Sequence, residues 1–354
     1  MKRVMITFRE GGENGGPFNS HKRIINSNLN EKYEFIPLVI PKGRLGVINI
    51  RLTKYLIREI RKENPDIIHF SGLELGGFHV ALACKIIGVN KSVVAIHGST
   101  SESISYNKTF FKKRIISFLE FLTLKWTRYS YGVSEYVSSW SKVKMHGNNY
   151  FGHIYNMVSV EVDQSKRISI KEQLSIPNGT RIAVSTGRIV TEKGYDILTD
   201  VIKRDVNENL VYVIVGDGDY LPEMKKRLKK EIENRKVYFL GYREDVLDIL
   251  SECDLCVMAT LHETLCMSLA EAAFMGLALV ASNVGGIPEI IVEGYNGYLI
   301  EKGNVLEFNN KINEIVTDKE LLAKMKVNSK IHAKEKFSNL TIESQLEKLY
   351  EGIK

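Results

Sequence analysis

Two glutamates, separated by a short uncharged segment, are the residues best suited to chemistry in this chain. Glu263 and Glu271 lie eight residues apart, and residues 264–270 between them carry no charge. A carboxylate accepts hydrogen bonds from two hydroxyl groups at once, which is how proteins hold vicinal diols such as a ribose. The spacing therefore predicts a diol-binding site, with one alternative for Glu271. Ser268 and Glu271 also have the S-x-x-E spacing of a capping box, in which the glutamate only stabilises a helix start.

A second set of candidate residues carries positive charge. Arg188 and Lys193 lie five residues apart in GRIVTEKG, between a β-rich run that ends near Gly187 and a helix expected to begin at Tyr195. Two cations at a helix N-terminus are suited to binding a diphosphate. The intervening Glu192 leaves open a salt bridge within the loop in place of a ligand.

The first half of the chain offers a glycine-rich loop and a histidine. Gly15 and Gly16 close the loop REGGENGGPF, where the absence of side chains lets backbone amides approach an anion before a helix begins. The loop has neither Walker nor G-x-G-x-x-G spacing, so a turn without a ligand is its alternative. His97 ends the run SVVAIHG, at the position where parallel sheets bind ligands. A purely structural histidine is the alternative there.

Around these residues, short β-rich runs alternate with amphipathic helical stretches, twice over. The alternation predicts an α/β fold of two doubly wound, Rossmann-like domains that bind ligands in loops at the carboxyl ends of their strands. We expect one domain over 1–158, a second over 159–338, and a final helix over 339–354 that crosses back to the first. The strands are expected at 3–8, 33–40, 66–71, 92–98, 128–134, 181–187, 210–218, 236–241, 254–259, 277–282 and 297–303, with helices at 195–204, 220–234, 244–252, 267–275 and 305–316.

Composition excludes several classes of protein. Of 354 residues, 26% are charged and 44% hydrophobic, which is normal for a globular protein and excludes disorder. No run reaches membrane-spanning length, the N-terminal segment turns polar too early for a signal peptide, and four cysteines fit a reducing cytoplasm. Cys253 and Cys256 form a C-x-x-C without a second pair at metal spacing, so we expect no metal there.

Charge is unevenly divided along the chain. Residues 1–158 hold 23 Lys and Arg against 11 Asp and Glu, a net +12, whereas residues 159–354 hold 26 against 31, a net −5. The segment 107–130 adds bulky apolar residues to six of the cations, which makes adsorption to an anionic membrane surface plausible. The alternative is a connecting helix whose core-facing stripe is Phe111, Ile115, Phe118, Leu119, Leu122 and Trp126. No nucleic-acid-binding motif accompanies the basic charge, so we expect no nucleic-acid partner.

Taken together, these stretches resemble the retaining glycosyltransferases of family 4, the glycogen-synthase-like group 1 enzymes with the GT-B fold. The family's E-x7-E motif and its flanks read here ETLCMSLAEAAFMGLALVASNVGGIPEII. GRIVTEKG, VGDGD and VYFLGY match upstream, and the first half supplies AIHG and GVSEYV. The resemblance is dense over residues 181–300 and looser before residue 150.

The resemblance implies metal-independent transfer of a hexose, without a cofactor, from a UDP- or GDP-sugar to a glycan or lipid-linked glycan in cell-envelope polysaccharide or glycolipid assembly. Glu271 would bind the ribose, Glu263 the hexose hydroxyls, and Arg188 and Lys193 the leaving diphosphate, with His97 beside the transferring sugar. The remaining donor-site residues would be Thr264, Leu265, Cys266 and Met267 through their amides, Gly15, Gly16, Gly187 and Gly216 near the phosphates, and Tyr242 and Arg243 near the base.

One departure and one alternative remain. The family usually has an aromatic residue and a glycine after the first glutamate, where this chain has Leu265 and Cys266. The identity of the donor sugar therefore does not follow from the resemblance. An enzyme of the same fold that isomerises or releases the sugar, such as an epimerase or a phosphorylase, is the alternative function.

Overall fold

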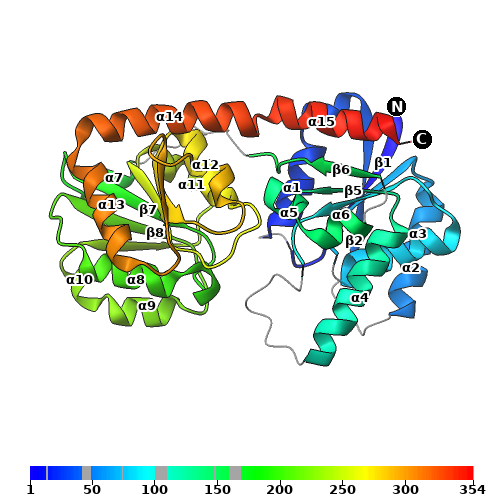
Figure 1. Ribbon diagram of the computed structural model, residues 1–354, viewed down its shortest axis with the longest axis horizontal. Helices are drawn as coiled ribbons and strands as arrows, with labels where there is room; N and C mark the ends of the chain where they lie inside the picture. The colour runs from blue at the N-terminus through cyan, green and yellow to red at the C-terminus, as the bar shows by residue number, and fades with distance from the viewer. Residues whose placement is uncertain are drawn as a thin grey trace. The chain divides into compact units, whose positions relative to one another are not determined.

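The computed structural model describes residues 1–12, 15–41, 49–73, 75–99, 110–146, 149–158 and 169–353 (Figure 1). The chain forms two compact units, each described here by itself. Unit 1 comprises Met1–Met157 and Phe337–Lys354, and unit 2 comprises Val158–Lys336. The expected domain boundary after residue 158 adjoins residues 159–168, which lie outside the described ranges.

Unit 1 is built on a six-stranded parallel sheet with strand order β2-β1-β3-β4-β5-β6. Its central strands are short apolar runs buried on both faces, as expected when helices cover both sides of a parallel sheet. The strands are β1 (Lys2–Arg9), β2 (Tyr33–Ile40), β3 (Ile67–Ser71), β4 (Ser92–Ile96), β5 (Tyr129–Gly132) and β6 (Tyr150–His153).

The helices of unit 1 are stopped and started by recognisable residues. Asn49 caps α2 by accepting a hydrogen bond from the Leu52 amide, and the helix ends at Asn64 in the left-handed conformation, just before Pro65. The helices are α1 (Gly16–Ile25), α2 (Ile50–Glu63), α3 (Leu75–Ile87), α4 (Phe110–Trp126), α5 (Glu135–Ser138), α6 (Ser141–His146) and α15 (Asn339–Gly352), with a 3-10 turn η1 (Asn28–Glu31).

The last helix of the chain, α15, packs on the sheet of unit 1. In Figure 1 this red helix lies beside the start of β1, where Lys2 Nζ donates to the Tyr350 carbonyl at 3.2 Å. The fully buried Tyr350 hydroxyl hydrogen-bonds His69 Nδ1 of β3 at 2.7 Å. Lys32 pairs with Glu347 at 2.6 Å on the surface. The N-terminal sheet is thus completed by residues from the far end of the sequence.

Unit 2 repeats the design with strand order β12-β11-β10-β7-β8-β9, again all parallel. The strands are β7 (Arg181–Thr186), β8 (Leu210–Val215), β9 (Val237–Gly241), β10 (Leu255–Met258), β11 (Ala278–Ser282) and β12 (Gly297–Ile300). The helices and 3-10 turns are α7 (Ile170–Gln173), η3 (Thr191–Lys193), α8 (Tyr195–Arg204), α9 (Leu221–Arg227), α10 (Lys229–Glu233), α11 (Val246–Ser251), α12 (Met267–Met275), η4 (Ile287–Glu289), α13 (Val305–Thr317) and α14 (Lys319–Phe337).

These two sheets confirm the predicted α/β class of two doubly wound, Rossmann-like layers. Two details differ from the prediction. Strand β6 was not expected, because four half-exposed residues interrupted by Gly152 at φ 90° carry little β signal. The helix expected over 220–234 breaks at Leu228 into α9 and α10. Among the described helices, none is both long and apolar enough to cross a membrane.

Helix α4 buries a different face from the predicted one. Leu119 and Leu124 are buried together with the polar Glu120 and Thr123, whereas Phe118 is 58% exposed. The prediction that Phe118 faces the core is wrong, because Glu120 and Thr123 find polar partners inside the unit and occupy the inner face. Residues 107–109 of the basic segment lie outside the described ranges.

Candidate active site

The predicted donor-site residues of unit 2 lie on loops at one edge of its sheet and in the helix α12 that follows one of these loops. Gly187, Arg188 and Lys193 follow β7, and Gly216 follows β8. Residues 242–243 follow β9, residues 263–266 lie between β10 and α12, and Met267 is the first residue of α12. Because the strands are parallel, these loops leave the sheet at the carboxyl edge, where doubly wound folds bind ligands.

Glycine packing holds the β7 and β10 loops together. Gly194 has φ 67°, and a Cβ atom at this position would lie 1.8 Å from the Ala259 carbonyl oxygen. The Leu261 amide also donates to the Glu192 carbonyl at 3.2 Å. Only glycine permits both this backbone angle and this approach. Lys193, the residue before Gly194, is thereby held against the β10 loop.

The loop after β11 supports Glu263 from the other side. Gly285 has φ 56°, and a Cβ there would lie 1.7 Å from the Glu263 carbonyl oxygen. The neighbouring Gly286 amide donates to the same carbonyl at 3.2 Å. The glycine pair in SNVGGIPE therefore has a mechanical reason, since it lets two loops pack backbone against backbone beneath a candidate ligand-binding carboxylate.

Lys193 and Glu263 form an ion pair at the edge of the sheet. Lys193 Nζ lies 2.7 Å from Glu263 Oε1, and the two side chains are 24% and 10% exposed. Burial acts to lower the pKa of Lys193, but the charge and hydrogen bond of Glu263 outweigh it, so the lysine pKa is raised and the ammonium is retained. The carboxylate paired with Lys193 is Glu263, rather than the adjacent Glu192 that the sequence left open.

Arg188 adds a second cation to this corner. It is exposed, and it is near enough to Lys193 for its charge to oppose the rise in the lysine pKa. Two cations and one carboxylate leave a net positive charge at the carboxyl edge. Such a corner can attract a diphosphate while the carboxylate accepts hydroxyl donors.

Helix α12 begins where an anion could meet free backbone amides. Its N-cap is Cys266, which makes no side-chain capping bond, so the first amides inside the helix belong to Met267 and Ser268. Ser268 is consequently not the N-cap, and the capping-box alternative for Glu271 is wrong. Glu271 lies half-buried in the second turn of the helix.

The two residues that depart from the family pattern are both buried. Leu265 is 5% exposed and Cys266 is 3% exposed, while Thr264 and Met267 on either side are partly exposed. Burial, reinforced by the nearby charge of Glu263, raises the pKa of the Cys266 thiol well above its usual range. The thiol is therefore neutral and acts by its size and shape rather than as a nucleophile.

The remaining unit 2 candidates sit on the β7, β8 and β9 loops. Gly216 has φ 139°, and a Cβ on it would lie 1.9 Å from the Gly187 carbonyl oxygen, so this pair packs as closely as the other glycines. Tyr242 is 60% exposed. Arg243 Nε donates to Asp245 at 2.7 Å, a bond that orders the loop and raises the pKa of the arginine.

In unit 1, the glycine loop leads directly into α1. Gly15 is the N-cap of α1, and its amide donates to the Gly12 carbonyl at 2.8 Å. A Cβ at Gly16 would meet nothing within 4 Å, so this position has open space in front of it. The helix start therefore offers backbone amides and room, the two requirements for an approaching anion.

His97 follows β4 at the carboxyl edge of the unit 1 sheet. Its Nε2 is buried and has no hydrogen-bond partner among the described residues. Burial and the neighbouring His21 lower the pKa of His97 to about 3. The imidazole is therefore neutral at physiological pH, and it can exchange a hydrogen bond with a sugar hydroxyl but supplies no charge to a phosphate.

Sequence reasoning missed His21, which lies between His97 and His69. The ring centroid of His21 is 6.4 Å from that of His97 and 4.9 Å from that of His69. Its Nδ1 must carry a proton, because it bonds the Thr7 carbonyl at 2.8 Å. Burial lowers its pKa to about 4, an effect that this bond partly offsets. Its position one turn into the helix after the glycine pair was the available signal.

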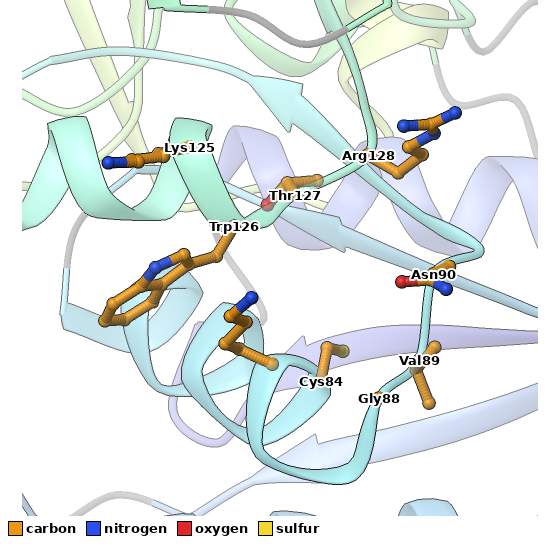
Figure 2. Close-up of a pocket in the computed structure, with 9 residues that line it drawn as sticks. Cys84, Gly88, Val89, Asn90, Lys125, Trp126, Thr127 and Arg128 are labelled. Atoms are coloured by element: carbon orange, nitrogen blue, oxygen red, sulfur yellow. The ribbon is translucent and has the colours of Figure 1, made fainter.

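A separate cavity of about 200 Å³ lies at the opposite end of the unit 1 sheet (Figure 2). It is lined by the ends of α3 and α4 and the residues that follow them, and its lining includes the cations Lys85, Lys125 and Arg128. The cavity therefore lies at the amino edge of the parallel strands, away from the carboxyl edge where doubly wound folds bind ligands. Within the described ranges, no group of three His, Cys, Asp or Glu side chains is placed to hold a metal ion.

Known proteins resemble the chain both in sequence and in fold. Residues 166–332 match the family model described as glycosyl transferases group 1. The UDP-Gal:alpha-D-GlcNAc-diphosphoundecaprenol alpha-1,3-galactosyltransferase of Escherichia coli is 25% identical, over 75% of this chain and 70% of that protein. The N-acetyl-alpha-D-glucosaminyl L-malate synthase of Bacillus anthracis is 24% identical, over 85% and 78%.

The fold agrees with that of a solved structure in complex with UDP-glucose. Anabaena Alr3699/HepE in complex with UDP-glucose superposes with a TM-score of 0.83 at 19% identity, covering 99% of this chain and all of that one. At this identity the likeness concerns the fold, which is GT-B. The family match over residues 166–332, the named relatives and the shared fold agree: unit 2 has the sequence of the group 1 glycosyl transferases, and the chain has the GT-B fold.

Proposed function

We propose that this glycosyltransferase moves a hexose from a UDP-sugar to a hydroxyl group of a glycan or lipid-linked glycan, with retention at the anomeric carbon and without a metal. The observation that carries the proposal is the corner formed by Lys193, Glu263 and Arg188 at the carboxyl edge of the unit 2 sheet. It combines a carboxylate for hydroxyls with cations for a diphosphate, within one ligand's reach.

The Lys193–Glu263 pair suits the bond that breaks. In a nucleotide sugar the hexose and the diphosphate meet at the anomeric C–O bond, where charge grows on the leaving phosphate oxygen. An ammonium 2.7 Å from a carboxylate can face the phosphate while the carboxylate faces the sugar hydroxyls. Arg188 and the amides at the start of α12 would add stabilisation of the leaving group, usually the largest catalytic contribution. Glu271 would hold the ribose.

Retention without a protein base is consistent with the state of His97. With a pKa of about 3, His97 is too weak a base to remove the acceptor's proton at neutral pH. The leaving phosphate oxygen would take that proton on the same face of the sugar, which preserves the anomeric configuration. His97 would then position a sugar hydroxyl, and Gly15 and Gly16 would give the phosphates room.

Two relatives support UDP as the nucleotide. The Anabaena structure carries UDP-glucose, and the E. coli enzyme is named for UDP-Gal. The test is a thermal-shift comparison of UDP, GDP and ADP, since a ligand at a hundred times its Kd adds about 2.7 kcal/mol of stability. We expect UDP to give the largest shift. No shift with any nucleotide contradicts the donor site.

Turnover is tested separately, by UDP release from UDP-glucose and UDP-galactose with and without a metal chelator. We expect release to persist in the chelator, and NMR of the product to show the anomeric configuration of the donor. Loss of activity in chelator contradicts metal independence, and an inverted product contradicts retention.

We also propose that α4 lies on an anionic membrane at the cytoplasmic face, where a lipid-linked acceptor is found. Its exposed side carries Lys112, Lys113 and Arg114, and Phe118 is 58% exposed. The Phe118 ring lies 6.3 Å from that of Phe121. Aromatic side chains among lysines are typical of helices that lie in a membrane interface.

Co-sedimentation with vesicles tests this surface. We expect wild-type protein to bind vesicles containing anionic lipid at low salt, and a Phe118→Ser/Lys112→Glu/Lys113→Glu variant to lose most of that binding while keeping its melting temperature. Binding that is absent, or that is indifferent to lipid charge, contradicts the proposal and favours a soluble acceptor.

A further inference from the structure

We infer that Glu120 and Lys142 are positioning residues that hold the loop His97–Ser99 in place for transfer. The inference rests on the proposed function, in which His97 lies beside the transferring sugar. It concerns two charged residues of unit 1 that are not part of the proposed donor site. Both contact Ser99, in the loop that contains His97.

Three side chains from three segments of unit 1 close a triangle of polar contacts. Lys142 Nζ of α6 donates to Glu120 Oε2 of α4 at 2.6 Å and to Ser99 Oγ at 2.7 Å. The Ser99 hydroxyl in turn donates to Glu120 Oε2 at 2.9 Å. The loop after β4 is thereby tied to α4 and α6 two residues beyond His97.

The cluster is buried to a degree that needs explanation. Glu120 is fully buried, Ser99 is 7% exposed, and the Lys142 side chain is 23% exposed. A buried ion pair contributes little to stability compared with well-packed apolar residues of similar volume. Leu119 and Leu124 show that the same side of α4 also takes apolar residues. The charged pair instead fixes the orientation of the Ser99 hydroxyl, because this hydroxyl accepts from the ammonium and donates to the carboxylate.

Among the described residues, His97 Nε2 has no hydrogen-bond partner, and the contacts of Ser99 anchor the loop beyond β4. Gly98, the residue between His97 and Ser99, has nothing within 4 Å of its would-be Cβ. The backbone at Gly98 can therefore move, and His97 would move with it if Ser99 were not held in place. A displacement of about 1 Å at a substrate-positioning group can cost about a hundredfold in rate. The triangle therefore controls turnover through the position of His97 rather than through contact with the substrate.

The experiment separates stability from positioning. Glu120→Gln leaves the Lys142 ammonium without its charge partner and is expected to lower the melting temperature of unit 1. The double variant Glu120→Met/Lys142→Met replaces the pair by apolar side chains of similar length and is expected to recover most of that loss. Trp126 and Trp140 are the only two tryptophans in the sequence and both lie in unit 1, so their fluorescence follows this unit.

The decisive readout is UDP-glucose turnover in the double variant. We expect kcat about 10- to 100-fold below wild type with KM for UDP-glucose unchanged, because the nucleotide binds unit 2. The His97 imidazole NMR signals are expected to move as well, a readout that does not depend on the donor's identity. Thr123→Val is the matched control, since the Thr123 hydroxyl bonds only the Leu119 carbonyl, at 2.8 Å, on the same helix face. It is expected to alter neither readout.

Two results overturn the inference. One is a double variant that recovers both stability and wild-type turnover, which reduces the cluster to a structural role. The other is an unmoved His97 signal in that variant. Failure of the proposed function has a different signature, because the wild-type enzyme then turns over no UDP-sugar while the His97 signal still reports whether the loop depends on the triangle.

Discussion

Two lysine–glutamate ion pairs of the protein, one in each unit, have similar geometry but different roles. Lys142–Glu120 in unit 1 and Lys193–Glu263 in unit 2 have similar lengths, 2.6 and 2.7 Å, and lysines of similar exposure, 23% and 24%. Their third neighbours differ. A serine hydroxyl completes the first pair, whereas a second cation, Arg188, stands near the second. A pair completed by a protein hydroxyl positions a loop, whereas a pair left beside a second cation can take a ligand.

The largest effect is expected from removing either cation of the Lys193–Glu263–Arg188 corner. Arg188→Ala and Lys193→Ala are each predicted to lower UDP-sugar turnover by about 10²–10³, the usual cost of losing one contact to developing charge. The two variants should differ in stability. Arg188 is exposed, so its loss should leave the melting temperature unchanged, whereas Lys193→Ala leaves Glu263 buried without its partner and should lower it.

Lys229→Ala is the control for that comparison, because Lys229 is an 81% exposed cation of unit 2 that pairs at 3.9 Å with Glu233 on the same short helix. It should affect neither turnover nor stability. Near-normal turnover in both Arg188→Ala and Lys193→Ala would mean that the diphosphate binds elsewhere.

Acid should weaken unit 1 selectively. His21 and His97 have folded-state pKa values of about 4 and about 3, below the ordinary 6.5. Between those values and pH 6.5 the unfolded chain binds more protons than the folded one. Their contribution is therefore complete above about pH 6.5 and is lost as the pH falls, by about 1.4 kcal/mol per pH unit for each histidine.

The measurement is the free energy of unfolding from tryptophan fluorescence at several pH values between 7.5 and about 4.5. His21→Gln should reduce the slope by one histidine's share. An equal slope in wild type and His21→Gln contradicts the assignment of a neutral, buried His21.

The smallest effect concerns Glu271. With Cys266 as the N-cap, this glutamate has no capping role, so Glu271→Ala should not produce the loss of about 1 kcal/mol expected from removing a helix cap. Loss of a carboxylate–diol contact should still weaken UDP binding about tenfold, with Glu271→Gln intermediate, as measured by calorimetry. Unchanged UDP affinity in Glu271→Ala removes the ribose assignment.

Much of the fold could be predicted because parallel strands buried on both faces are continuous apolar runs. β7, β8 and β11 lie where LVYVIV-like runs indicated, and α12 begins and ends as expected at Met267 and Gly276. The site loops follow from the same logic, since chemistry-bearing residues stood directly after strands.

What could not be predicted depends on long-range pairing. Nothing in the spacing of Lys193 and Glu263, seventy residues apart, shows that they meet at 2.7 Å. The inner face of α4 was predicted from the spacing of apolar residues. That spacing cannot predict a buried Glu120, because its burial depends on the ion pair with Lys142 from another helix. The position of His21 likewise could not be predicted, because its neighbours His69 and His97 come from β3 and from the loop after β4.

The packing of α15 on unit 1 bears on how the protein is made. Residues 337–354 belong to the N-terminal unit, yet they are synthesised after the whole of unit 2. Until then His69 lacks the Tyr350 hydroxyl at 2.7 Å, and the face of β1 and β3 that the helix covers is incomplete. Domains tend to fold in order as they emerge from the ribosome. Here, however, unit 1 emerges first but should complete its folding after unit 2, because it needs α15.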